Sequence, residues 1–165
     1  MDRDRIDQLQ DDWETVRPDL DTEPMGVVLR VQALARIFND QASDRLEEFD
    51  LQWWQYDVLS TLRRQGEPYA MAATELADAN RLTSGAMTNR IDRLQDADLI
   101  LRREDPEDRR RVIVQLTRRG MSLIEKATEV RFESATAAIA SLSHRDRDQL
   151  SQLLRKVLLA QEQSC

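Results

Sequence analysis

Residues 75–120 read "ELADANRLTSGAMTNRIDRLQDADLILRREDPEDRRRVIVQLTRRG". Two stretches with helical spacing, about Ala70–Ala79 and Ser84–Ala97, are separated by the short segment "NRLT". Thr83 is a residue type that caps a helix through its side-chain oxygen. Apolar residues of the second stretch recur at spacings of 4 and 3, which predicts one buried helix face. These residues are Met87, Ile91 and Leu94. The pattern therefore predicts a helix, a tight turn and a second helix.

Two extended segments follow the second helix. They are "LILRRE" at 99–104 and "RRVIVQL" at 110–116, and the polar turn "DPED" at 105–108 links them. Alternating apolar residues on both sides of a polar turn predict a β-hairpin. A helix-turn-helix followed by a two-stranded wing is suited to duplex DNA, because a helix fits the major groove and a basic wing reaches the neighbouring backbone or minor groove.

Further helices are expected on both sides of this module. Apolar spacing predicts a short helix from Ile6 to Val16, a long one from Pro24 to about Glu48, and a third from Leu51 to Gln65. After the hairpin, Thr117 and Ser143 are expected to cap two last helices, one running through Glu133 and one through Ala160. The apolar stripes of the flanking helices are wider than one core face requires, which indicates a partner surface.

The expected fold class is mainly α, a winged helix-turn-helix module with a two-stranded wing between long N- and C-terminal dimerisation helices. Only four glycines and four prolines occur in 165 residues, which favours long helices over a many-stranded sheet. We expect one domain over residues 1–165. Its parts are N-terminal helices at 1–48 that contribute to the dimer interface and the ligand site, the winged module at 51–119, and C-terminal dimerisation helices at 120–165.

Composition also limits the location and the chemistry. The single cysteine, Cys165, excludes an internal disulfide and a thiolate metal cluster. No run of eighteen apolar residues and no signal-peptide pattern is visible, so a cytoplasmic protein without a membrane partner is expected. The only histidine, His144, follows a helix cap, and no nucleophile, Walker or metalloprotease motif is present. We therefore expect no catalytic residues, no metal site, no cofactor and no enzyme activity.

Charge is unevenly distributed along the chain. The net charge is -7, yet residues 81–119 hold ten arginines against seven carboxylates, a balance of +3. The first 23 residues hold nine acids and three arginines, a balance of -6. Since the local field decides nucleic-acid contact, the basic middle of the chain is compatible with DNA binding despite the acidic total.

Four small polar or glycine positions on the second helix of the module are expected to face a DNA groove. If the apolar face is buried, the positions that turn outward are Ser84, Gly85, Thr88 and Asn89. Hydroxyl and amide groups hydrogen-bond to base edges or phosphate, and a glycine permits close approach. The alternative is that they form an ordinary polar surface.

Residues 75–120 closely resemble the winged helix-turn-helix of the multiple-antibiotic-resistance regulator (MarR) family, and the flanking helices occur in that family's order. The resemblance implies a homodimer that binds a pseudo-palindromic double-stranded operator and represses transcription, with its two reading helices about one helical turn, ~34 Å, apart. It also implies that Asp108, Arg109 and Arg110 form the wing tip. Arg110 would enter the minor groove, Arg109 would also contact DNA, and Asp108 would brace an arginine.

A narrower resemblance concerns the urate-responsive regulators within this family. It implies a ligand site made of Trp13, Asp57, Arg90 and Arg102. Two arginines suit an anionic purine, a carboxylate accepts from ring N–H groups, and an indole stacks. Such a ligand would pull on the reading helix through Arg90 and release the operator.

Other interpretations of these residues stay open. Asp57 and Arg90 could form a plain salt bridge, Trp13 could pack its helix onto the dimer, and Arg102 could contact phosphate. A phenolic acid such as salicylate, or a xenobiotic, is the alternative effector to urate or a related purine. A dimeric interaction protein that no longer binds DNA is the alternative function, and the acidic total supports it.

Overall fold

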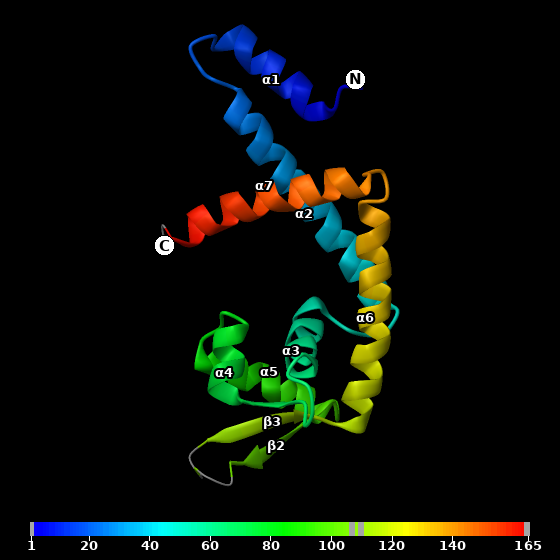
Figure 1. The fold of residues 1–165 in the computed structure, drawn as a ribbon. Helices are drawn as coiled ribbons and strands as arrows, with labels where there is room; N and C mark the ends of the chain where they lie inside the picture. Colours follow the sequence, from blue (N-terminus) through cyan, green and yellow to red (C-terminus); the bar gives the residue numbers. More distant parts are fainter. Residues whose placement is uncertain (1, 106–107, 109–110, 164–165) are drawn as a thin grey trace. The chain divides into compact units, whose positions relative to one another are not determined.

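The structure is a computed structural model that describes residues 2–105, 108 and 111–163 (Figure 1). The chain divides into two compact units, Met1–Asp44 and Arg45–Cys165. The elements are α1 (Arg5–Val16), α2 (Glu23–Glu47), α3 (Trp53–Arg63), β1 (Ala70–Ala72), α4 (Ala73–Ala79), α5 (Ser84–Asp96), β2 (Ile100–Glu104), β3 (Val112–Leu116), α6 (Arg118–Ala138) and α7 (His144–Glu162). None of the described helices is long and apolar enough to cross a membrane.

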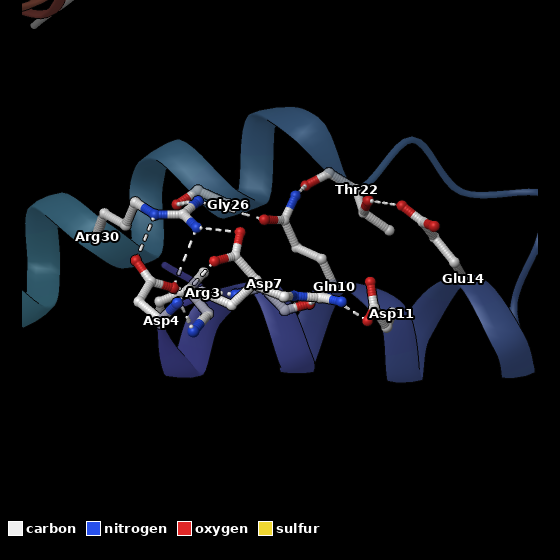
Figure 2. A network of polar contacts seen from close by, with 10 residues as sticks. Arg3, Asp4, Asp7, Gln10, Asp11, Glu14, Thr22, Gly26 and Arg30 are labelled. Carbon is white, nitrogen blue, oxygen red and sulfur yellow. Dashed lines mark hydrogen bonds and ion pairs between the residues drawn. The ribbon is translucent and has the colours of Figure 1, made fainter. Parts of the chain in front are cut away.

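In the N-terminal unit, Arg30 of α2 holds the start of α1 (Figure 2). Its guanidinium donates to the Asp4 carboxylate at 2.9 Å and to the Asp7 carboxylate at 2.7 Å. Asp4 is also the N-cap of α1, where its side chain accepts from the backbone of Ile6 and Asp7. The same arginine therefore secures both the helix cap and the packing of α1 on α2.

A second set of contacts joins the middle of α1 to the first turn of α2. Gln10 donates to the Thr22 carbonyl at 2.9 Å, and the Thr22 hydroxyl donates to Glu14 at 2.7 Å. Gly26 permits this approach, since a Cβ there would lie 2.5 Å from the Gln10 side chain. The interface between the two helices is thus largely polar, although Ile6 is buried.

The core of the C-terminal unit lies between α3, α4, α5, the sheet and α6. The predicted apolar face of α5 is confirmed: Met87, Ile91 and Leu94 are at most 2% exposed. They pack with buried side chains of the other elements, among them Val58, Leu62, Leu76, Val114 and Ile124. Burial of this face fixes which side of α5 remains in solvent.

The sheet has three antiparallel strands in the order β1-β3-β2. The predicted hairpin is confirmed, with Arg102 opposite Val114 and Glu104 opposite Val112. The prediction of one helix over Ala70–Ala79 is wrong at its start, because Ala70–Ala72 pairs with the other edge of β3. Alanine and methionine favour helix, but intrinsic propensity is a small term, so tertiary backbone pairing overrides it here.

Predicted helix caps occur where expected. The Thr83 hydroxyl accepts from the Ala86 backbone, the Thr117 hydroxyl from Gly120 at 2.9 Å, and the Ser143 hydroxyl from Asp146. Each cap satisfies a backbone N–H that would otherwise lack a partner within the helix. The starts of α5, α6 and α7 are therefore set by local sequence.

The two adjacent tryptophans at the start of α3 differ in burial. Trp53 is 41% exposed and stacks on Tyr56 with ring centroids 5.8 Å apart. Trp54 is partly buried and packs against the core. The helix begins at Trp53, two residues later than predicted, because Leu51 enters the core before the first turn.

We expect Arg30→Gln to loosen α1 from α2, because it removes the ion pairs to Asp4 and Asp7. Hydrogen exchange measured by mass spectrometry should become faster in Arg5–Val16. Arg3→Gln is the matched control, since Arg3 bonds only to Asp7 and Asp11 of the same segment among the described residues. Equal exchange rates in the two variants would contradict this role of Arg30.

The same contact predicts an acid response of α1. Hydrogen bonding from Arg30, helped by the Asp7 backbone, lowers the pKa of Asp4 below its ordinary value of 3.8. A lowered folded-state pKa contributes stability above the unfolded value, and that contribution is lost as pH falls through the folded value. Protection of α1 should therefore decrease below about pH 4, and this loss should be smaller in Arg30→Gln than in Arg3→Gln.

Candidate nucleic-acid interface

The outer face of α5 carries small polar groups close to the helix start. Ser84, Gly85, Thr88 and Asn89 are all exposed, as the sequence predicts. Nothing lies within 4 Å of the position that a Cβ on Gly85 would occupy. The Thr88 hydroxyl donates to the Ser84 carbonyl at 2.9 Å and keeps its acceptor capacity. This end of α5 thus presents free backbone and hydroxyl groups on a surface that a large ligand can approach closely.

The wing, which is the hairpin of β2 and β3, is tied to α4 by Arg111, which lies beside the turn of the hairpin. The Arg111 guanidinium donates to Glu75 of α4 at 2.7 Å and lies 3.8 Å from the Asp105 carboxylate. The Arg111 backbone N–H also donates to the Asp108 carbonyl at 2.9 Å. The sequence does not indicate this role of Arg111, because its partner Glu75 is 36 residues away and no spacing rule relates them. Arg109 and Arg110, predicted to contact DNA, lie outside the described residues.

The Arg102 side chain of β2 contacts α5, the helix that is expected to face a DNA groove. It forms an ion pair with Asp92 and donates to Gln95 at 3.0 Å. Arg102 is a predicted ligand-site residue together with Asp57 and Arg90, and in the structure its side chain is bound to α5. These bonds join the base of the wing to the second half of α5.

Arg90 and Arg93, on neighbouring turns of α5, both lie over the ring of Trp54 from α3. The guanidinium carbon is 5.5 Å from the ring centroid for Arg90 and 4.9 Å for Arg93. Both distances are within the range of a cation–π contact. Arg90 thus packs against an aromatic ring, a contact that the sequence did not indicate.

Asp57 is half-buried on α3 and is bound through its backbone. Its carbonyl accepts from the Ser60 hydroxyl at 3.0 Å and the Thr61 hydroxyl at 2.8 Å. In the part of the chain that the structure describes, no hydrogen bond or ion pair reaches its carboxylate, and none joins Asp57, Arg90 and Arg102 to one another. The structure therefore gives these three predicted site residues separate surroundings.

Trp13 belongs to the N-terminal unit, where it is 48% exposed on α1. A cavity of about 470 Å³ in the same unit does not include it. The cavity is lined by Gln10, Glu14, Pro18, Leu20, Asp21, Thr22 and Glu23. Because three of these residues are carboxylates, the cavity does not suit an anionic ligand.

Over residues 2–105, 108 and 111–163, no group of three or more histidine, cysteine, aspartate or glutamate side chains is placed to hold a metal ion. Helices α4 and α5 form a helix-turn-helix, and the hairpin of β2 and β3 lies beside it as a wing.

Comparison with known proteins gives the same class. The sequence profile of the MarR family matches residues 51–112. The chain is 32% identical to the HTH-type transcriptional regulator PecS of Dickeya dadantii over 153 residues, which is 92% of each chain. It is 32% identical to the HTH-type transcriptional repressor NicR of Pseudomonas putida over 143 residues, 86% of each chain.

Solved structures show the same fold. AbsC, a MarR family transcriptional regulator from Streptomyces coelicolor, superposes with a TM-score of 0.75 at 24% identity, covering 87% of this chain and 96% of that one. The S. aureus MepR–DNA complex superposes with a TM-score of 0.72 at 25% identity, covering 81% and 96%.

The fold and the relatives define the class: this is a winged helix-turn-helix transcriptional regulator and not an enzyme. The chain belongs to the MarR family. The predicted fold class is confirmed, and the likeness to PecS agrees with the predicted subgroup.

Proposed function

We propose that the protein is a homodimeric repressor that binds a pseudo-palindromic DNA operator and leaves it when a small anionic ligand, urate or a related purine, is bound. The observation that carries the proposal is the two-sided character of α5. One face is buried by Met87, Ile91 and Leu94, and the opposite face exposes short polar groups beside a wing. An α-helix presented in this way fits a major groove.

DNA binding is supported by the chemistry of the exposed face. Hydroxyl and amide side chains near the start of α5 provide donors and acceptors for base edges and phosphate. The first turn of a helix also offers backbone N–H groups to a phosphate. MepR, which shares the fold, has been solved as a DNA complex. Arg109 and Arg110 in the wing are the proposed additional contacts.

A second copy of the chain is the proposed partner of α7. No described residue of this 19-residue helix is buried, although it carries one apolar face. The face is formed by Leu150, Leu153, Leu154, Val157 and Leu158, which are 39% to 58% exposed. A contiguous apolar stripe of this kind marks a protein interface. A two-fold dimer also places two reading helices on two half-sites of a palindrome.

The proposed effector site uses Asp57, Arg90 and Arg102. The Asp57 carboxylate, to which no described residue bonds, is a free acceptor for ring N–H groups of a purine. The guanidinium groups can bind carbonyl oxygens and neutralise an anion. A phenolic acid or other xenobiotic is the alternative effector, because an arginine pair suits a carboxylate equally well.

The first experiment measures operator binding. A mobility-shift titration with DNA upstream of the protein's own gene should give a specific complex that weakens by about 10³ or more between 50 and 200 mM salt, as expected for six or more phosphate contacts. Gly85→Ala and Arg110→Ala should each weaken it by roughly 5- to 100-fold. The added methyl of Gly85→Ala meets nothing in the free protein, so its loss of affinity would report on DNA alone.

Arg145→Ala, which removes an exposed arginine at the start of α7, is the control for lost charge and should leave affinity unchanged. The absence of any shift at micromolar protein and low salt would reject the repressor in favour of an interaction protein.

The second experiment tests the dimer. Leu154→Asp places a carboxylate on the apolar face of α7 and should convert the protein to monomers in sedimentation velocity at micromolar concentration, because burying an unpaired charge is costly. Gln152→Asp places the same charge on the opposite side of the helix and should leave the dimer intact. A dimer that survives Leu154→Asp would move the interface away from α7.

The third experiment identifies the effector. Urate should bind in isothermal titration calorimetry and weaken the operator complex, and Asp57→Asn or Arg90→Gln should weaken urate binding by about tenfold or more. Asp148→Asn, on α7, is the control. Urate binding that is equal in all variants would refute this site, and a response to salicylate alone would replace urate by the alternative effector.

A further inference from the structure

Trp54 is the only described residue of α3 whose side chain receives two cations from α5. The guanidinium groups of Arg90 and Arg93 lie 5.5 and 4.9 Å from its ring centroid. The indole N–H donates to the Gln52 side chain at 2.5 Å, which fixes the orientation of the ring. The ring also packs against the core, which limits its movement.

The neighbouring Trp53 has the same chemistry but a different partner. Its ring lies under Arg131 of α6, with the guanidinium carbon 5.4 Å from the centroid. Of two adjacent tryptophans on one helix, Trp54 therefore holds two arginines of α5 and Trp53 holds one arginine of α6. Only the Trp54 contact involves the helix that carries the outward polar groups Ser84, Thr88 and Asn89.

Arg90 and Arg93 have no other bond among the described residues. No hydrogen bond or ion pair to either guanidinium occurs in residues 2–105, 108 and 111–163, so the Trp54 ring is the fixed group that they contact. A guanidinium stacked on an aromatic face keeps its in-plane N–H groups available. The contact thus holds the arginines and leaves their donors free.

We propose that Trp54 is a positioning residue that holds α5 in its DNA-reading orientation through Arg90 and Arg93. Arg102 acts on the other side of the same half of α5, through Asp92 and Gln95. The second half of the helix is thereby fixed at two points, by α3 and by the wing, while its first half stays free to contact DNA.

This inference deepens and rests on the proposed function, because it also identifies what an effector must overcome. In the proposed switch, an effector bound beside Asp57 draws Arg90 away from the Trp54 ring. Arg93 is then the remaining contact between that ring and α5. The strength of the contact between Trp54 and Arg90 therefore lowers the affinity of the free protein for the effector.

The test is a mutant cycle measured by operator affinity at fixed salt. Trp54→Leu should weaken binding about tenfold in the wild-type background, through loss of two cation–π contacts. In an Arg90→Gln, Arg93→Gln background the same substitution should change affinity by less than about twofold, the limit of additivity for independent sites. An equal tenfold loss in both backgrounds would show that Trp54 only packs, and would overturn the proposal.

Trp54→Phe separates the ring face from the indole N–H. Phenylalanine keeps a weaker aromatic face and lacks the bond to Gln52, so its affinity should fall between those of the wild type and Trp54→Leu. A Trp54→Phe variant as weak as Trp54→Leu would assign the effect to the N–H bond and contradict the proposal.

Trp53→Leu, in the wild-type and Arg131→Gln backgrounds, is the matched control. It removes a cation–π contact of the same kind one residue away, made to α6 instead of α5, and should leave operator affinity unchanged in both backgrounds. If Trp53→Leu weakens the operator complex as much as Trp54→Leu does, general damage to α3 explains the loss, and the proposal fails.

Two further measurements separate this inference from the proposed function. Trp54→Leu should speed hydrogen exchange in Ser84–Asp96 of the free protein, whereas Trp53→Leu should not. The exchange rates test whether Trp54 holds α5 even if the protein forms no operator complex. Absence of an operator complex would reject the proposed repressor function but not this contact. Urate should bind Trp54→Leu several-fold more tightly than the wild type, because Arg90 no longer contacts the Trp54 ring. If the variant binds both DNA and urate more weakly, the substitution has only damaged α3, and the proposal fails.

Discussion

Burial of one face of α5 is the constraint on which the rest of the structure depends. Met87, Ile91 and Leu94 enter a core supplied by α3, α4, the sheet and α6. Their burial fixes the rotation of the helix about its own axis. Every other property of α5 follows from that rotation, including the exposure of its small polar groups, the direction of its arginines and the side from which β2 can bind it.

Sequence periodicity was sufficient for this constraint because apolar spacing depends on local geometry alone. The caps at Thr83, Thr117 and Ser143 were predictable for the same reason, since each bonds to a backbone N–H within three residues. The exposed stripe of α7 was also readable from spacing. What local rules missed was β1, whose pairing with β3 joins residues more than forty positions apart.

Side-chain partners of the arginines were the least predictable part of the site. The sequence supplies many carboxylates for each guanidinium, and only the folded chain selects Asp92 for Arg102 and Glu75 for Arg111. The ring of Trp54 is a partner without charge, so a search for opposite charges could not find it. A resemblance to a family indicates which residue types matter, whereas their contacts in the free protein depend on neighbours that the motif does not include.

The two ends of the hairpin and the first turn of α6 meet without room for a side chain. A Cβ on Gly120 would lie 1.9 Å from the Leu99 carbonyl oxygen, and that same oxygen accepts from the Thr117 N–H at 3.1 Å. The Thr117 hydroxyl donates to the Asp98 carbonyl at 2.7 Å. These contacts join the base of the hairpin directly to the first turn of α6. A change in the tilt of α6 would therefore also displace the hairpin, and a side chain at position 120 would force the two apart.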